Sequence, residues 1–204
     1  MIDLQTARGW RVVNGAADTD PPDADAALLA LGRSGNAEAL ERLLARHEPG
    51  MLALCRGLLG RRDDAEDAVQ EAFLRALRAL HRFRGDSSVR TWLYRIAVNV
   101  CLEWKRSRGF GHASLSFDME GSHPSPEADV LARARLDDAL AALLPRQRAV
   151  ILLKELHGFS VAEAAAAMGW SVTRAQNELY SARKRLAAWR ISEDERTIRE
   201  EGGR

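Results

Sequence analysis

The sequence contains little that would brace a small secreted fold or cross a membrane. Only 2 of its 204 residues are cysteines, Cys55 and Cys101, and only 6 are prolines. Because these cysteines are far apart in the sequence and form no CxxC motif, a disulfide framework is excluded and a structural zinc site is not expected. Free cysteine is often buried, and we predict that both side chains are buried. No run approaches the roughly 18 apolar residues of a membrane span, and the N-terminus has no apolar signal core. We therefore predict a cytoplasmic protein without direct membrane insertion.

An excess of one charge is also absent, since 30 basic residues stand against 29 acidic ones. A net charge of +1 argues against a polybasic coat protein or an acidic disordered chain. Locally the charges are not balanced. Residues 72–108 hold 9 basic and 2 acidic side chains, and residues 146–190 hold 8 and 3. This pattern predicts two separate contacts with a polyanion, and the alternative is chance segregation on solvated helix faces.

Aromatic residues make up only 6% of the chain, whereas alanine, leucine and arginine are frequent, which favours helices. The chain length suits one or two domains, and we predict an all-α protein of two small helical domains. Glycine, serine and proline mark a linker between them. The expected segments, in order, are a flexible arm (1–24), a helical bundle (25–106), the linker (107–125), a four-helix domain with a helix-turn-helix (126–190) and a charged tail (191–204).

The first domain is expected to hold four helices around one core. Asn36 can cap a helix that runs to Arg46, and a new helical turn can begin at Pro49. Asp63 and Glu66 indicate a capping box at the next helix, and Ser87 or Ser88 can cap the last one. Spacings of three and four predict the buried face of the third helix: Val69, Phe73, Ala76, Leu77 and Leu80.

The second domain ends in a predicted helix-turn-helix. Ser160 and Glu163 form a capping box for a short helix that ends at Gly169, and Ser171 caps a longer one. In this motif the N-terminal residues of the second helix reach base edges in the major groove. An ordinary helical hairpin is the alternative. The polar residues predicted to contact bases or phosphates are Thr173, Arg174, Gln176, Asn177, Arg183 and Lys184.

The helix over residues 64–81 has an unusual outer face. Asp67, Gln70 and Glu71 cluster there, and the two carboxylates repel each other at a spacing of four residues. A basic partner surface would offset this repulsion and indicates a protein-docking face. The alternative is a solvated first turn that the helix dipole favours.

Aromatic and basic residues alternate from residue 83 onward. Rings stack on unpaired bases while cations follow the phosphates, so the pattern is typical of single-stranded nucleic-acid binding. The alternative is that these aromatic side chains belong to the core. We favour it for Trp104, but not for Phe83, which is predicted to lie in a loop. The residues assigned to this surface are Phe83, Arg84, Arg90, Trp92, Arg95 and Asn99.

Three segments together resemble a bacterial RNA polymerase sigma factor of the two-domain extracytoplasmic-function group: DAEDAVQEAFLRALRAL (64–80), FRGDSSVRTWLYRIAVNV (83–100) and LPRQRAVILLKELHGFSVAEAAAAMG (144–169). The resemblance covers about residues 25–190. It implies that Asp67, Gln70 and Glu71 bind the clamp of the largest subunit of the polymerase core.

The resemblance also implies two contacts with promoter DNA. The loop from Phe83 and the following helix would read the minus-ten element as a single strand, with Phe83 and Asn99 capturing a flipped base while Trp92 and the arginines assist strand opening. The helix that begins at Val172 would read the minus-thirty-five element as duplex. An anti-sigma factor is an expected further partner.

One residue departs from the family pattern. Glu178 stands where a basic residue is common, and it could accept from cytosine or pair with Arg174. The alternative function is a helix-turn-helix regulator that acts without being a polymerase subunit. An enzyme finds little support, because the five histidines are scattered and no catalytic motif is recognisable. We therefore predict no catalytic residues, no metal and no cofactor.

Overall fold

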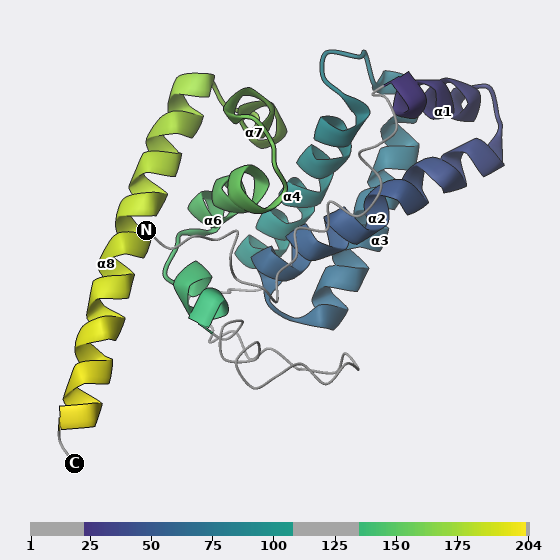
Figure 1. Ribbon diagram of the computed structural model, residues 1–204. Coiled ribbons are helices and arrows are strands. Elements are labelled where there is room, and N and C mark those ends of the chain that lie inside the picture. Colours follow the sequence, from purple (N-terminus) through teal and green to yellow (C-terminus); the bar gives the residue numbers. More distant parts are fainter. Residues whose placement is uncertain (1–22, 108–134, 203–204) are drawn as a thin grey trace.

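A computed structural model of the protein describes residues 23–107 and 135–202, which are helical apart from short connections (Figure 1). The N-terminal domain contains α1 (Asp23–Arg33), α2 (Ala37–Leu59), α3 (Arg62–Ala79), the 3-10 turn η1 (Leu80–Arg82) and α4 (Val89–Ser107). The C-terminal domain contains a helical segment over 135–141, then α6 (Pro145–Ile151), the π-helical turn η2 (Leu152–Leu156), α7 (Val161–Met168) and α8 (Val172–Gly202). The predicted all-α class is confirmed.

Helix α2 is continuous, so the predicted restart at Pro49 is wrong. Pro49 lies inside the helix, where the missing N–H costs about 3 kcal/mol in an isolated helix. Residues on both sides of it are buried, including Leu43, Met51 and Leu54. Gly50 lies so close to the Tyr94 hydroxyl that a Cβ there would collide with it. Packing against α4 therefore overrides the local helix-breaking signal.

The helix ends follow the predicted caps in most places. Asn36 accepts from the Ala39 N–H at 3.0 Å, and Ser88 accepts from the Thr91 N–H at 3.1 Å. The capping box at Asp63 is wrong, because α3 begins two residues earlier, after Arg61, without a side-chain cap. Its first turn instead carries Asp63 and Asp64, which interact favourably with the helix dipole.

Helix α4 lies between the other N-terminal helices and the C-terminal domain, and α8 forms the opposite side of the molecule (Figure 1). One continuous core joins the two domains. The Tyr94 ring lies 5.0 Å from the Phe159 ring, and Arg148 Nη1 donates to the Leu58 carbonyl at 3.5 Å. A Cβ on Gly57 would come within 2.9 Å of Leu152 Cδ1, so α2 and η2 are in close contact. We call this contact between α2 and α4 on one side and residues 148–169 on the other the interdomain interface.

Several predicted segments fall partly outside the described residues. The arm up to residue 22, the linker over 108–125, the predicted helix start at Ser125 and the last two residues of the tail belong to this group. Residues 191–202 were predicted to be a frayed tail, but α8 continues through them to Gly202. These positions are mostly good helix formers without proline, and so nothing local ends the helix before glycine.

A polar clasp joins α1 to α2. Asp25 contacts His47 Nε2 at 2.7 Å and Arg46 Nη1 at 3.0 Å. Burial alone would raise the pKa of Asp25, but the hydrogen bonds and charges of His47 and Arg46 outweigh it and lower that pKa below 3.8. The charged carboxylate therefore stabilises the folded chain at neutral pH, and this contribution disappears as the pH falls below 3.8 toward the lowered value.

We expect Asp25→Asn to lower the free energy of unfolding by about 1–3 kcal/mol at pH 7, since it weakens hydrogen bonds to charged groups. Urea denaturation measures this loss, and the difference from the wild type should shrink below pH 3.8, where the wild-type carboxylate takes up its proton. Glu38→Gln, at an exposed position of α2, is the control. An equal loss at both pH values would rule out the ionised clasp.

Candidate polymerase and nucleic-acid interfaces

The predicted docking face lies on the outer side of α3. Asp67 and Gln70 are exposed, whereas Glu71 is half-buried. Glu71 accepts from Arg75 Nε at 2.7 Å, and Arg75 Nη1 donates to Glu103 of α4 at 2.6 Å. These two hydrogen bonds raise the pKa of Arg75. The bridge holds the Glu71 carboxylate in place and offsets part of its repulsion with Asp67.

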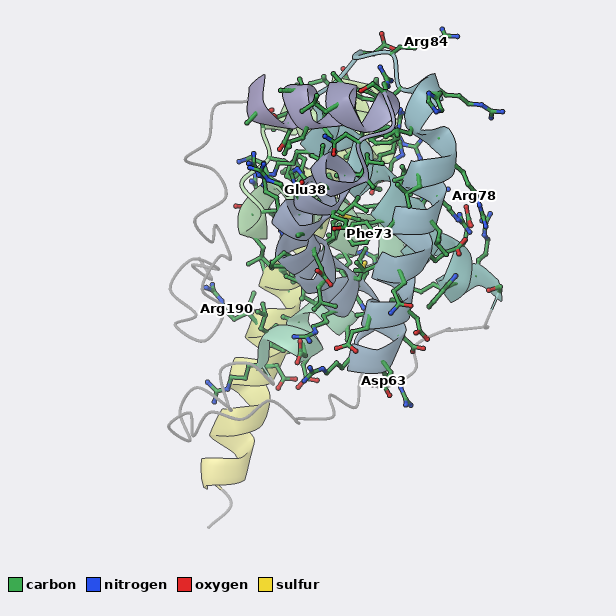
Figure 2. All side chains as sticks on the ribbon, turned by 90° about the vertical axis from the view of Figure 1, so that its right-hand side faces the viewer. Glu38, Asp63, Phe73, Arg78, Arg84 and Arg190 are labelled. Carbon is green, nitrogen blue, oxygen red and sulfur yellow. The ribbon has the colours of Figure 1, made fainter. Side chains whose placement is uncertain are left out.

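Two leucines extend this face beyond the residues that the sequence singled out. Leu74 is 49% exposed and Leu77 is 39% exposed, so the prediction that Leu77 belongs to the buried face is wrong. Arg78 projects outward from the same helix (Figure 2). The spacing of Asp67, Gln70, Leu74 and Arg78 at three or four residues was the available signal. We call the exposed stripe formed by Asp67, Gln70, Leu74, Leu77 and Arg78 the α3 stripe.

The loop between η1 and α4 presents charged residues at one tip of the molecule. Arg84 projects into solvent there (Figure 2), and Gly85 adopts a φ of 80°. Phe83 is half-buried at the start of the loop, with its ring 5.0 Å from the ring of Trp92. The structure therefore brings Phe83 and Trp92 together as an aromatic pair beside the exposed Arg84.

The other predicted minus-ten residues lie along α4 and have different surroundings. Arg95 and Asn99 are exposed at a spacing of one helical turn. Arg90 is half-buried in the interdomain interface, where its guanidinium lies 4.1 Å from the centre of the Phe159 ring. Its Nη2 donates to the His157 carbonyl at 2.5 Å. Arg90 is thus occupied by the C-terminal domain in this arrangement.

The helix-turn-helix forms as the caps predict. The Ser160 N–H donates to Glu163 at 2.8 Å, and the Glu163 N–H donates to the Ser160 hydroxyl at 3.2 Å. Gly169 ends α7 with a left-handed φ of 67°, and Ser171 accepts from the Arg174 N–H at 3.2 Å to open α8. These caps fix the turn between the two helices, and the first turns of α8 are exposed to solvent.

All four side chains predicted to read bases are exposed on the first turns of α8: Thr173, Arg174, Gln176 and Asn177. The Arg174 guanidinium lies 4.7 Å above the Trp170 ring. Lys184 is exposed, while Arg183 pairs with Glu155 at 2.6 Å. Sequence reasoning missed Tyr180, which is 73% exposed one turn beyond Gln176. Its spacing of seven from Thr173 was the available signal.

Glu178 has a partner within its own domain. The Gln147 side chain of α6 donates to it at 3.3 Å, and also to the Ser181 hydroxyl at 3.2 Å. This contact differs from both roles considered for Glu178 in the sequence. The acidic residue ties α8 to α6, which gives its departure from the family pattern a structural explanation.

The interdomain interface buries basic groups without fully satisfying them. Burial, together with the charge of Arg90, lowers the pKa of His157 to about 3, and burial lowers the pKa of Arg148 to about 10. Within the described part of the chain, His157 Nε2 and Arg148 Nε have no hydrogen-bond partner. Buried polar atoms without partners are costly, so this interface is less stable than its apolar contacts alone would make it.

Comparison with known proteins identifies the family. Residues 43–110 match Sigma-70 region 2, and residues 133–186 match Sigma-70, region 4. The chain is 35% identical to the RNA polymerase sigma factor CnrH of Cupriavidus metallidurans over 83% of its own length and 95% of the relative. The chain belongs to the sigma-70 family. It is a sigma factor, which directs RNA polymerase to promoters, and it is similar to the extracytoplasmic-function group.

Other relatives support the same assignment of this sigma factor. It is 34% identical to the ECF RNA polymerase sigma factor SigM of Mycobacterium tuberculosis, over 80% of the chain and 83% of the relative. Its fold matches CnrH in complex with the cytosolic domain of CnrY, with a TM-score of 0.66, 31% identity and coverage of 83% and 98%. It also matches RpoE of Bartonella quintana in complex with the anti-sigma factor NepR, with a TM-score of 0.60, 26% identity and coverage of 72% and 92%. Sigma factors are in general non-catalytic initiation factors.

The described residues of this sigma factor hold neither a cluster of metal-ligating side chains nor a membrane-spanning helix. Within residues 23–107 and 135–202, no group of three or more potential metal-ligating side chains occurs. Among the helices described in these ranges, none is long and apolar enough to cross a bilayer. The roles of individual site residues remain predictions.

We expect Asp67→Lys to weaken binding to the polymerase core by at least about tenfold, because it reverses a charge in the α3 stripe. This single change leaves the bridge between Glu71 and Arg75 in place, and so the fold should survive. Glu41→Lys, exposed on α2, is the matched control. Core affinity measured by fluorescence anisotropy, with circular dichroism as a check of folding, tests the assignment. Equal affinity of the two variants would remove Asp67 from the docking face.

Proposed function

We propose that this sigma factor binds the polymerase core through the α3 stripe and Glu71, and contacts promoter DNA at two separate places. The loop over 83–88 and α4 receive the minus-ten element as a single strand. The first turns of α8 enter the major groove of the minus-thirty-five element. Two observations on one chain support this assignment: an aromatic pair beside the exposed Arg84, and exposed polar residues on the first turns of the second helix of the helix-turn-helix.

The division into domains follows the same assignment. Residues 25–106 would form the part that binds core and the minus-ten element, and residues 126–190 the part that binds the minus-thirty-five element. Residues 1–24, 107–125 and 191–204 would form the arm, linker and tail. The chain would perform no chemistry of its own, and it would act in the cytoplasm, where the polymerase supplies catalysis.

An anti-sigma factor is a proposed regulator of the chain. The two solved relatives described above are sigma factors bound to CnrY and to NepR. An inhibitor that covered the α3 stripe or the interdomain interface would prevent assembly with core.

The packed arrangement of the domains conflicts with simultaneous binding of both promoter elements. Arg95 of α4 reaches the helix-turn-helix, since a Cβ on Gly169 would lie 3.2 Å from its Nη2. The two elements, however, are centred about 25 base pairs apart, which is roughly 85 Å of duplex. We infer that the interdomain interface opens when the sigma factor joins core, and that opening releases Arg90 for DNA.

We expect energy transfer between dyes at Glu38→Cys and Ala187→Cys to fall when core is added, because the two domains separate. Cys55 and Cys101 are buried, so labelling should favour the introduced exposed thiols. In the free chain Phe159→Ala should also lower transfer, since it removes the ring beneath Arg90. Unchanged transfer in the complex with core and promoter would refute the opening.

The main test is run-off transcription with purified core and genomic DNA fragments. We expect specific initiation only when the sigma factor is present, and transcripts that begin downstream of a shared pair of elements. The alternative, a regulator that acts without being a polymerase subunit, predicts duplex binding without core, which a mobility-shift assay measures. Failure to initiate on every genomic promoter, together with core-independent operator binding, would favour that alternative.

A further inference from the structure

The minus-ten loop is held at its base by a residue of a different helix, which the sequence motifs did not include. Arg33 lies in the last turn of α1, about 50 positions before the loop. Its Nε donates to the Leu80 carbonyl at 3.0 Å, and its Nη2 donates to the Phe83 carbonyl. One guanidinium therefore binds both ends of the four-residue segment that leads from η1 into the loop.

The same guanidinium also contacts the aromatic pair. Its carbon lies 5.8 Å from the centre of the Phe83 ring, within the range of a cation–π interaction. The Phe83 ring in turn lies 5.0 Å from Trp92 on α4. Arg33, Phe83 and Trp92 thus form a row that connects α1, the loop and α4. We call this row the loop anchor.

The loop beyond the anchor has little support of its own. Arg84, Gly85 and Asp86 are exposed, and the next fixed point is Ser88, which caps α4. The direction in which the loop leaves the body is therefore set at its two ends. Of these, the end at Phe83 depends on Arg33, because Phe83 is bound to it through both its carbonyl and its ring.

The core can form without this guanidinium. The Leu80 side chain is itself buried in the core, and α1 packs on the core through Leu28 and Leu29, without help from Arg33. The Leu80 carbonyl also accepts from the Phe83 N–H at 3.4 Å, and so it retains a partner when Arg33 is removed. Loss of Arg33 should therefore affect the geometry of the loop more than the stability of the fold.

Capture of an unpaired base requires a loop that is already in position. Ordering a mobile loop at the moment of binding reduces affinity, and a preformed loop avoids this cost. We propose that Arg33 is a positioning residue for the single-stranded minus-ten element: it holds Phe83 against Trp92 and so keeps the loop over 84–87 in a binding-competent geometry. This inference rests on the proposed function, because the ligand of the loop is the one assigned there.

The test compares Arg33→Met, which keeps most of the aliphatic part of the side chain but removes the guanidinium, with Arg33→Lys, which keeps the charge. Arg42→Met, an exposed position on α2, is the matched control for loss of one positive charge. Two readouts are used. The first is the rate of trypsin cleavage after Arg84 in the free protein. The second is the affinity of the reconstituted holoenzyme for a 2-aminopurine-labelled non-template oligonucleotide carrying the minus-ten element of a promoter mapped by run-off.

We expect trypsin to cleave the Arg33→Met variant faster after Arg84. Its holoenzyme should bind the oligonucleotide about tenfold more weakly, which corresponds to the loss of a hydrogen bond from a charged donor. Core affinity should stay within about twofold, and Arg33→Lys should recover part of the loss. Arg42→Met should behave as the wild type in both assays.

Two results would overturn the inference. Arg33→Met could match Arg42→Met in both assays, or it could increase cleavage while leaving oligonucleotide affinity unchanged, which would make Arg33 a purely structural residue. Both are distinct from failure of the proposed function, in which wild-type holoenzyme itself gives no specific initiation and binds no minus-ten strand.

Discussion

Burial of α4 from two sides is the constraint on which the other features of this sigma factor depend. Its apolar residues complete the N-terminal core with α2 and α3, while Arg90 and Tyr94 lie against Phe159 of the C-terminal domain. The same helix carries residues assigned to DNA. A helix that is packed on both sides can present only a narrow face to a ligand, and so DNA access to α4 is coupled to the position of the C-terminal domain.

Buried polar groups in the interdomain interface weaken the packing of the C-terminal domain on α4, the packing that limits DNA access to this helix. Aromatic and aliphatic contacts favour the packed arrangement, but burial disfavours the charged forms of His157 and Arg148, and a nitrogen of each has no hydrogen-bond partner within residues 23–107 and 135–202. This combination agrees with the proposal that the domains separate on core and so expose two distant surfaces assigned to DNA.

Charge follows the same division of tasks. The basic segments coincide with α4, which we assign to the minus-ten element, and with the helix-turn-helix. Several of their cations are paired internally, as Arg183 is with Glu155. Asp67 lies on the α3 stripe with Glu71 beside it, and Glu178 stabilises the position of α8 through Gln147. A near-zero net charge is therefore compatible with DNA binding that depends on delivery by polymerase.

Local signals were sufficient for the helical class, most caps and the exposed first turns of α8, because capping and helical periodicity act over a few residues. They failed where distant packing decided the outcome. Pro49 remains inside α2 because α4 covers that helix, and Leu77 is exposed because α3 is packed through another face. The clasp of Asp25 with His47, the pair of Arg90 with Phe159 and the anchor of Arg33 on Phe83 join residues at least 22 positions apart. Such contacts form only when tertiary packing brings separate helices together, and no spacing within one segment encodes them.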